Sequence, residues 1–288
     1  MKAGFIGLGH LGRAMAKRLM AEGVELGIWN RTPQKAEGLG GRLAESPASL
    51  ISAVDIVFIN LFDSDAVQAV LSGPGGLLKA DCQGKIVVDT TTNHFDRVTD
   101  FHRLMAEAGA SYLEAPVLGS VVPAQQGNLT VLISGGKVAY EKALPLIRKI
   151  GKTIFFLEEA GLATRMKLIN NLVLGCLMAS LAEAVAFGED VGISRARVID
   201  ILAAGAGNSG VLSAKKDKLL TDDFSTQFSS SLIYKDLHYL QDLARQLKRP
   251  LFTGSVAKEV YGMTFSRGLE GLDFSAVYML LKEFGGRS

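Results

Sequence analysis

A lysine and an asparagine with helical spacing form the most chemically suggestive pair in this chain. Lys167 and Asn171 lie four positions apart within the sequence GLATRMKLINN of residues 161–171. Positions i and i+4 share one face of a helix, so the amine and the carboxamide are predicted to point into one pocket. On spacing alone, an exposed helical lysine is the commoner explanation. The chemistry therefore depends on what the rest of the chain supplies.

A glycine-rich turn near the N-terminus predicts a dinucleotide site. Residues 7–12 read GLGHLG, a GxGxxG motif that follows an apolar strand pattern and precedes a helical one, as the dinucleotide fingerprint requires. Gly7 permits a tight turn, Gly9 lets the backbone approach a pyrophosphate, and Gly12 lets the helix pack on the sheet. The helix N-terminus then offers free N–H groups to the phosphates. The residues expected to bind the cofactor here are Gly7, Leu8, Gly9, His10, Leu11 and Gly12; for His10, a solvated position is an equal alternative.

The end of the second predicted strand indicates which dinucleotide binds. An acidic residue at this place would hydrogen-bond the ribose 2′-hydroxyl of NAD, but the chain has Asn30, Arg31 and Thr32. No carboxylate repels a 2′-phosphate here, and Arg31 offers it a planar charged fork. We therefore predict that these three residues bind the cofactor and that NADP(H) is preferred over NAD(H). A solvated surface arginine is the alternative.

The order of the predicted elements sets the fold class. Short apolar strands alternate with helices as far as Leu157, and helical periodicity with almost no strand signal begins at Gly161. This order predicts an α/β Rossmann domain with a mostly parallel sheet, followed by an all-α domain joined to it by a long helix. We place the two domains at residues 1–160 and 161–288. The predicted strands are 2–7, 24–29, 55–60, 86–89, 111–114, 130–134 and 153–157, and the predicted helices are 9–23, 35–43, 46–53, 65–71, 95–109, 139–150, 166–192, 194–204, 210–218, 230–246, 254–268 and 275–284.

Composition excludes several classes of function. With 48% hydrophobic and 21% charged residues the chain is globular, and a net charge of +2 gives no electrostatic case for nucleic acid. The two cysteines and four histidines show no metal-ligand spacing, so no metal site is predicted.

Residues 168–187 approach the length of a membrane span, but Asn170, Asn171 and Glu183 interrupt them, so we expect a buried interdomain helix and no membrane. The apolar run at the N-terminus is too short for a signal peptide, and a cytoplasmic protein is expected.

The motifs together resemble the β-hydroxyacid dehydrogenase family, which includes 3-hydroxyisobutyrate dehydrogenase, tartronate semialdehyde reductase and glyoxylate/succinic semialdehyde reductases. The resemblance covers essentially the whole chain. It rests on GFIGLGHLGRAMAKRL, WNRTPQKA, EAPVLGSVVPAQQGNLTVLISGG, GLATRMKLINN and the late pair Lys235-Asp236. It implies a Rossmann domain, a long connecting helix, an all-helical domain, and a homodimer or homotetramer.

The resemblance also implies roles for individual residues. Lys167 would be the general acid/base, and Asn171 would orient the substrate beside it. The segment 114–120 would form the substrate-binding loop, and Thr92 and Lys235 would lie near the cofactor. Asp236 would either orient Lys235 or be a surface charge. The residues expected to bind substrate are Pro116, Val117, Leu118, Gly119 and Ser120.

One departure from the family concerns the substrate. The common loop sequence is SGG, whereas this chain has Leu118, Gly119 and Ser120. The side chain at position 118 can no longer hydrogen-bond a carboxylate, although the backbone N–H groups of Gly119 and Ser120 still can. Leu118 therefore favours a more apolar or longer substrate.

These residues predict an NADPH-dependent reductase. It would interconvert a small carboxylate-bearing aldehyde, such as glyoxylate or succinic semialdehyde, and its hydroxy acid. The cofactor would supply the hydride and the Lys167 ammonium the proton. One alternative is oxidation of a 3-hydroxy acid such as 3-hydroxyisobutyrate. Another, from a different class, is a non-catalytic nucleotide-binding interaction module on the same fold.

Overall fold

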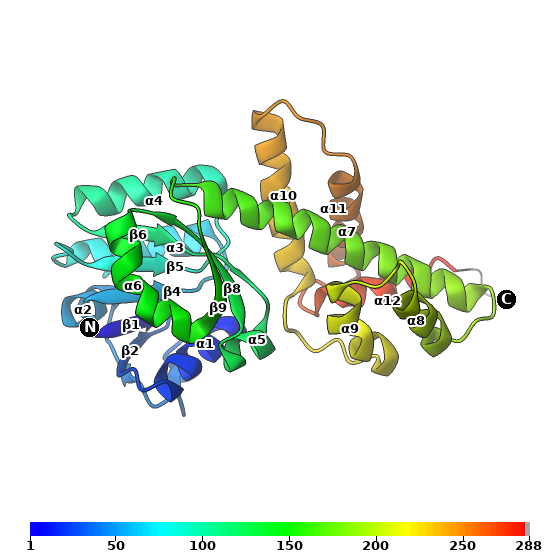
Figure 1. Cartoon of the computed structure of the whole chain (residues 1–288), viewed down its shortest axis with the longest axis horizontal. Helices are drawn as coiled ribbons and strands as arrows, with labels where there is room; N and C mark the ends of the chain where they lie inside the picture. The colour runs from blue at the N-terminus through cyan, green and yellow to red at the C-terminus, as the bar shows by residue number, and fades with distance from the viewer. Residues whose placement is uncertain (286–288) are drawn as a thin grey trace. The chain divides into compact units, whose positions relative to one another are not determined.

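The computed structural model describes residues 1–285, and residue contacts divide the chain into two units, Met1–Lys167 and Leu168–Ser288 (Figure 1). The last three residues of the predicted second domain, 286–288, lie outside the described part. One continuous helix, α7 (Leu162–Asp190), begins in the first unit and ends in the second. The domain boundary between residues 160 and 161 remains a prediction, because contacts divide the chain inside this helix.

The first unit is built on a nine-stranded sheet with the order β3-β2-β1-β4-β5-β6-β8-β7, and β9 pairs with β8. The pairs from β3 to β6 are all parallel. The order reverses between β1 and β4, and such a switch point is where doubly wound folds bind dinucleotides. The strands are β1 (Ala3–Ile6), β2 (Leu26–Trp29), β3 (Arg42–Leu43), β4 (Ile56–Ile59), β5 (Ile86–Asp89), β6 (Ser111–Glu114), β7 (Val117–Leu118), β8 (Leu129–Gly135) and β9 (Gly151–Phe156).

Helices cover both faces of this sheet, which is why its central strands are apolar throughout (Figure 1). Successive strand residues point to opposite faces, so Phe5 joins one core cluster and Ile6 the other. The Phe5 cluster includes residues of α1, α5 and α6, and the Ile6 cluster includes residues of α2, α3 and α4. These helices are α1 (His10–Ala21), α2 (Pro47–Ala53), α3 (Ser64–Ser72), α4 (Phe95–Glu107), α5 (Val121–Gln126) and α6 (Lys137–Ile150).

The second unit is helical, and close helix contacts at two glycines of α7 help to assemble its core. A Cβ atom on Gly175 would lie 3.1 Å from Leu237, and one on Gly188 would lie 2.4 Å from Val198. The Tyr261 hydroxyl donates to the Gly175 carbonyl at 3.1 Å. The helices after α7 are α8 (Arg195–Ala204), α9 (Gly210–Thr221), α10 (Ser230–Gln246), α11 (Thr253–Gly262) and α12 (Val277–Lys282).

Three predicted helices are replaced in part by 3₁₀ turns, and the predicted helix 166–192 begins four residues earlier, at Leu162. Residues 35–43, predicted to be helical, form the 3₁₀ turn η1 (Pro33–Ala36) and strand β3, because Gly38 and Gly40 adopt positive φ angles of 66° and 85° that end a helix. The predicted helix 254–268 stops at Gly262 and is followed by the 3₁₀ turn η3 (Phe265–Arg267) and Gly268 at φ 66°. The predicted helix 275–284 starts as the 3₁₀ turn η4 (Phe274–Ala276) before α12.

The sheet contains antiparallel pairs that the sequence did not reveal. Strand β8 runs antiparallel to both β6 and β7, so only the part from β3 to β6 and the β8–β9 pair are parallel. Strand β7 and helix α5 were not predicted, because two and six residues are too few to show periodicity. The prediction of a mostly parallel Rossmann domain followed by a helical domain is nevertheless confirmed.

Helix α7 is long and apolar enough to cross a membrane by length and composition, with a mean hydropathy of 1.7. It is the one such helix among residues 1–285. This is weak evidence for a span, because core helices of globular proteins meet the same criterion. Within the structure, 39% of its most apolar window is buried.

Candidate active site

The glycine turn after β1 has the backbone geometry of a phosphate-binding loop. Gly7 has φ 95°, and a Cβ atom there would lie 2.1 Å from the Asn60 carbonyl oxygen. A Cβ atom on Gly12 would lie 2.0 Å from the Gly7 carbonyl oxygen, so neither position accepts a side chain. By contrast, a Cβ atom on Gly9 would meet nothing within 4 Å. The open space beside Gly9 is where a pyrophosphate would approach the backbone.

Helix α1 presents its first turn next to this space. Its N-cap is Gly9, whose carbonyl accepts the Arg13 N–H at 2.8 Å. Within the described residues, no side chain caps the preceding N–H groups of this helix. Uncapped N–H groups and the helix dipole favour an anion here, so these residues fit the pyrophosphate of a dinucleotide. His10, the first residue of the helix, is exposed.

Asn30 links the glycine turn to the end of β2. Its Oδ1 accepts the Leu8 N–H at 2.8 Å, and its Nδ2 donates to the Thr32 carbonyl at 2.9 Å. The sequence suggested a cofactor contact at Asn30 but did not reveal this bridge. Arg31 and Thr32 follow with exposed side chains. The segment after them is held by Arg13, whose guanidinium donates to the Glu37 carbonyl at 2.7 Å.

A buried carboxylate organises the segment that carries Thr92. Asp89, the last residue of β5, accepts hydrogen bonds from the Thr91 N–H at 2.9 Å, from Asn93 Nδ2 at 2.8 Å and from the Tyr112 hydroxyl at 2.5 Å. Burial raises the pKa of Asp89, although these three hydrogen bonds oppose the shift. Burial also raises the pKa of Tyr112 well above its ordinary value, and the neighbouring Asp89 adds to that shift. The half-buried Thr92 lies between the Thr91 N–H and the Asn93 side chain, both of which are hydrogen-bonded to Asp89.

The predicted substrate loop is partly a strand. Val117 and Leu118 form β7, in which Val117 pairs with Val131 and Leu118 with Thr130 of β8. Pro116 and Val117 are buried, whereas Leu118 and Ser120 are half-buried and Gly119 is exposed. Gly119 has φ 114°, and a Cβ atom there would lie 2.9 Å from Leu129, so this position requires glycine. The loop therefore has a fixed backbone.

Glu114, the last residue of β6, contacts the beginning of α7. Its Oε1 accepts the Gly161 N–H, and its Oε2 accepts the Thr164 N–H at 2.9 Å. Ser134 Oγ accepts the intervening Ala163 N–H at 3.0 Å. The sequence placed Glu114 at the start of the substrate loop, and nothing in the local pattern pointed to this contact. Lys167 follows one turn later in α7 and is 7% exposed.

Asn171 belongs to a buried polar cluster on α7 and α10. Its Nδ2 donates to Asp236 Oδ2 at 2.6 Å, and its Oδ1 accepts Asn170 Nδ2 at 3.1 Å. Lys235 Nζ lies 2.8 Å from Asp236 Oδ1, an ion pair without hydrogen-bond geometry, and 4.7 Å from the centre of the Tyr239 ring. Asp236 is 1% exposed, so it is no surface charge. It contacts both Asn171 and Lys235.

The two units each collect a part of the predicted site. In the first unit, four predicted site segments follow the carboxyl ends of strands at one edge of the parallel sheet: the glycine turn, residues 30–32, Thr92 and the loop 116–120. In the second unit, Asn171 lies with Asp236 and Lys235. Lys167 and Asn171 occupy consecutive turns of the continuous α7. Among residues 1–285, no group of three or more histidine, cysteine or acidic side chains is arranged to hold a metal ion.

A doubly wound sheet with a glycine turn at its switch point defines a dinucleotide-binding fold. Comparison with known proteins identifies its class. A family model described as the NAD binding domain of 6-phosphogluconate dehydrogenase matches residues 2–158. A second, described as NAD-binding of NADP-dependent 3-hydroxyisobutyrate dehydrogenase, matches residues 161–281. The chain is thus an NAD(P)-dependent oxidoreductase that acts on CH–OH groups.

Individual relatives narrow the class to a family. The chain is 33% identical to glyoxylate/succinic semialdehyde reductase 2, chloroplastic, of Arabidopsis thaliana, over 97% of this chain and 79% of the relative. It is 32% identical to 2-(hydroxymethyl)glutarate dehydrogenase of Eubacterium barkeri, over 100% and 97%. A solved structure, Psf3 in complex with NADP+ and 2-OPP, is 28% identical with a TM-score of 0.90, over 97% of this chain and 99% of that one. The chain belongs to the β-hydroxyacid dehydrogenase family.

Proposed function

We propose that the chain reduces a small carboxylate-bearing aldehyde to its hydroxy acid, with Lys167 as the general acid/base. The observation that carries this proposal is the placement of a buried lysine one helical turn before a buried asparagine on the continuous helix α7. Burying an ammonium group is costly unless it is paired or hydrogen-bonded, so a buried lysine is less common than an exposed one. An exposed helical lysine, the commoner reading of the spacing, would not be 7% exposed.

The proposed chemistry assigns one task to each side chain. NADPH, when bound, supplies the hydride for the carbonyl carbon. The ammonium of Lys167 donates a proton to the carbonyl oxygen and stabilises the negative charge that develops there. In the oxidation direction, the neutral amine of Lys167 accepts the proton of the hydroxyl group. Asn171 orients the substrate, and its own amide is held by Asp236 at 2.6 Å.

The loop 116–120 is the proposed contact for the substrate carboxylate. Gly119 and Ser120 offer backbone N–H groups on the backbone that β7 fixes. Leu118 replaces a hydroxyl with an apolar side chain and is half-buried, which favours a substrate longer or more apolar than glyoxylate. The relative named 2-(hydroxymethyl)glutarate dehydrogenase supports a substrate longer than glyoxylate.

We also propose that the chain prefers NADP(H) to NAD(H). Arg31 is exposed directly after β2, and the residues around it, Asn30 and Thr32, carry no negative charge. The related structure with NADP+ and the family name that includes NADP-dependent support the same preference. Arg31 would bind the 2′-phosphate with its guanidinium.

Two alternatives lead to different assay results. Oxidation of a 3-hydroxy acid is favoured by the family model for residues 161–281, which is named for 3-hydroxyisobutyrate dehydrogenase. A non-catalytic nucleotide-binding module would bind cofactor without turnover, and the dehydrogenase relatives weigh against it.

A substrate panel tests the proposal. The purified chain is assayed with glyoxylate, succinic semialdehyde, branched short aldehyde acids and 3-hydroxyisobutyrate, and NADPH or NADH absorbance is followed. We expect faster turnover of aldehyde acids with NADPH than with NADH, and a shift toward glyoxylate in a Leu118→Ser variant. Turnover confined to 3-hydroxy acids with NAD would support the alternative enzyme, and binding of NADPH without any turnover would support the interaction module.

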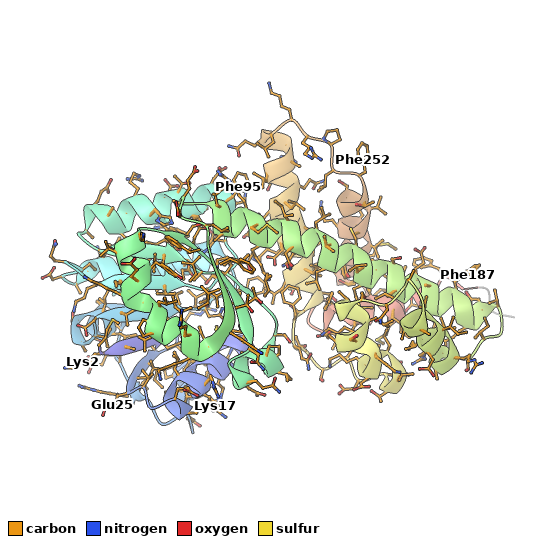
Figure 2. All side chains as sticks on the ribbon, in the orientation of Figure 1. Lys2, Lys17, Glu25, Phe95, Phe187 and Phe252 are labelled. Atoms are coloured by element: carbon orange, nitrogen blue, oxygen red, sulfur yellow. The ribbon has the colours of Figure 1, made fainter. Side chains whose placement is uncertain are left out.

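We further propose a homodimer or homotetramer that covers the apolar face of α7. The exposed side chains on this helix recur every three or four positions and include Ile169, Val173, Leu177 and Phe187. Phe187 is 67% exposed and Phe252, which precedes α11, is 80% exposed (Figure 2). Ile169, Val173 and Leu177 form a continuous apolar stripe, which Ser180 and Glu183 separate from Phe187. Exposed apolar stripes of this kind are typical of association surfaces.

A further inference from the structure

We propose that Glu114 is a positioning residue for the reaction, because its carboxylate fixes the first turn of α7 and thereby the place of Lys167. The proposal rests on the proposed function, in which Lys167 transfers the proton. Glu114 does not touch the reacting atoms in this account. It acts through the helix that carries the lysine.

The contacts of Glu114 use both of its oxygens. Oε1 accepts the N–H of Gly161, the residue that precedes α7, and Oε2 accepts the N–H of Thr164 in its first turn. Glu114 is 1% exposed, so water does not supply an alternative acceptor for these groups. A carboxylate at this end of a helix also interacts favourably with the helix dipole.

A second residue from the sheet completes the attachment. Ser134 Oγ accepts the Ala163 N–H at 3.0 Å and is 0% exposed. Glu114 and Ser134 are register partners in the antiparallel pair β6–β8. Three N–H groups at the beginning of α7 are therefore bound by two side chains that face each other across a strand pair. The sheet, rather than a local loop, sets where the helix begins.

The arrangement differs from an ordinary helix cap. Most N-caps are serine, threonine, aspartate or asparagine residues next to the helix in sequence, as Ser46 is for α2. Such a cap satisfies the N–H groups without attaching the helix to anything else. Glu114 lies 47 positions from Gly161 in sequence, and burying its charge is expensive. A distant buried carboxylate both caps the helix and ties it to β6.

This attachment reaches Lys167 through one turn of helix. Lys167 follows Thr164 by three positions, so a shift of the anchored N–H groups moves the lysine as part of the same rigid turn. A misplacement of about 1 Å can lower a rate by roughly a hundredfold. Three titratable side chains lie near Glu114: His102, whose Nε2 is 3.8 Å from Glu114 Oε1, Tyr112 on the same strand, and Asp89, its register partner on β5.

The test compares Glu114→Gln with Ser46→Ala. The glutamine keeps one acceptor oxygen but turns an N–H₂ group toward the second N–H, while Ser46→Ala removes a cap from α2, which carries no proposed site residue. We expect Glu114→Gln to speed amide hydrogen exchange in residues 161–167 and to lower kcat by about ten- to a hundredfold with an unchanged Kd for NADPH. Ser46→Ala should leave both properties at wild-type values. An unchanged kcat, or unchanged exchange at residues 161–167, would overturn the proposal.

A double variant separates this proposal from the role of Lys167 itself. If Glu114 acts through the lysine, Glu114→Gln costs much less in a Lys167→Ala background than in the wild type, because linked residues are not additive. An equal cost in both backgrounds would show that Glu114 acts independently of Lys167. If Lys167→Ala alone keeps full turnover, the proposed function fails, and the exchange data still report on the attachment. Should Glu114→Gln not fold, Ser134→Ala tests the same attachment, with a smaller but likewise non-additive loss of kcat expected.

Discussion

Asp89 and Glu114 are register partners at the ends of the neighbouring strands β5 and β6, and both are buried carboxylates. Asp89 accepts hydrogen bonds from the segment that contains Thr92, and Glu114 accepts them from the beginning of α7. Two adjacent strand ends therefore order two candidate site segments that are far apart in sequence. The sheet therefore positions the segment of the proposed cofactor contact and the helix of the proposed acid/base in the same way, through a buried carboxylate at the end of a strand.

The raised pKa of Asp89 predicts a pH-dependent stability. Because burial raises this pKa in the native state, the folded chain holds the proton more tightly than the unfolded chain, in which the pKa is about 3.9. The stabilisation from this proton is present at low pH and is lost as the pH rises through the raised pKa. We expect the free energy of unfolding of the wild type to fall, relative to Asp89→Asn, as the pH rises from about 4. Urea denaturation of both proteins across this pH range measures the two free energies of unfolding. If these depend on pH in the same way in both proteins, the prediction is wrong.

The Asp89→Asn variant is expected to fold because a neighbouring amide can adapt. Asn93 Oδ1 is buried without a hydrogen-bond partner among the described residues. Rotation of the Asn93 amide would turn this oxygen toward the new N–H₂ group at position 89, and the Tyr112 hydroxyl, which donates to the same Oδ2 in the wild type, can turn to accept its second hydrogen. The variant therefore reports on the charge of Asp89 and keeps the local hydrogen bonds.

The proposed 2′-phosphate contact predicts a selective effect of Arg31→Ala. A charge-assisted hydrogen bond contributes about 1.5–3 kcal/mol, which corresponds to roughly ten- to a hundredfold in Kd. We expect the Kd for NADPH to rise by this factor while the Kd for NADH changes less than about twofold. The control is Lys17→Ala, which removes an exposed positive charge from α1 (Figure 2). If the Kd values for NADPH and NADH rise by the same factor, Arg31 does not bind the 2′-phosphate.

Asp236 allows its hydrogen bond and its charge to be tested separately. Asp236→Ala removes the acceptor for Asn171 Nδ2, and we expect kcat/KM to fall by about ten- to a hundredfold, since hydrogen bonds to charged groups contribute about 1.5–3 kcal/mol. Asp236→Asn keeps an acceptor oxygen but loses the ion pair with Lys235, so it should retain more activity. Steady-state kinetics of both variants measures the difference. Equal losses would assign the effect to the charge rather than to the orientation of Asn171.

The apolar face of α7 predicts an effect on assembly. Phe187→Glu places a charge on this face, and Val138→Glu places one on α6; both side chains are 67% exposed in the wild type. We expect the Phe187 variant to lower the molar mass in solution to that of a monomer, and the Val138 variant to keep the wild-type mass. Light scattering coupled to size-exclusion chromatography measures both. A wild-type chain that is itself monomeric would contradict the proposed oligomer.

Local sequence pattern was sufficient for the longer elements but not for the short ones. The bounds of β5, β6 and α10 agree with the predicted ranges, since each has clear periodicity or an apolar run between turn residues. Strands β3 and β7 have two residues each, which is too short for any period to show. Strand direction also depends on pairing that a local pattern does not contain, so the antiparallel position of β8 was missed.

The same limit applies to the candidate site. Spacing within one helix was enough to place Lys167 and Asn171 on neighbouring turns of α7. The supporting contacts join residues that are distant in sequence, with separations of 22 for Leu8 and Asn30, 47 for Glu114 and Gly161, and 65 for Asn171 and Asp236. Only the folded chain brings these partners together.

The most direct test of the account is the turnover of Lys167→Ala, measured with the best aldehyde acid from the panel and with the Kd for NADPH in parallel. Loss of a general acid/base typically costs about a hundred- to ten-thousandfold, so we expect kcat to fall by that factor while the Kd for NADPH stays at its wild-type value. A variant that binds NADPH normally and keeps near wild-type turnover would contradict the assignment of Lys167 as the acid/base.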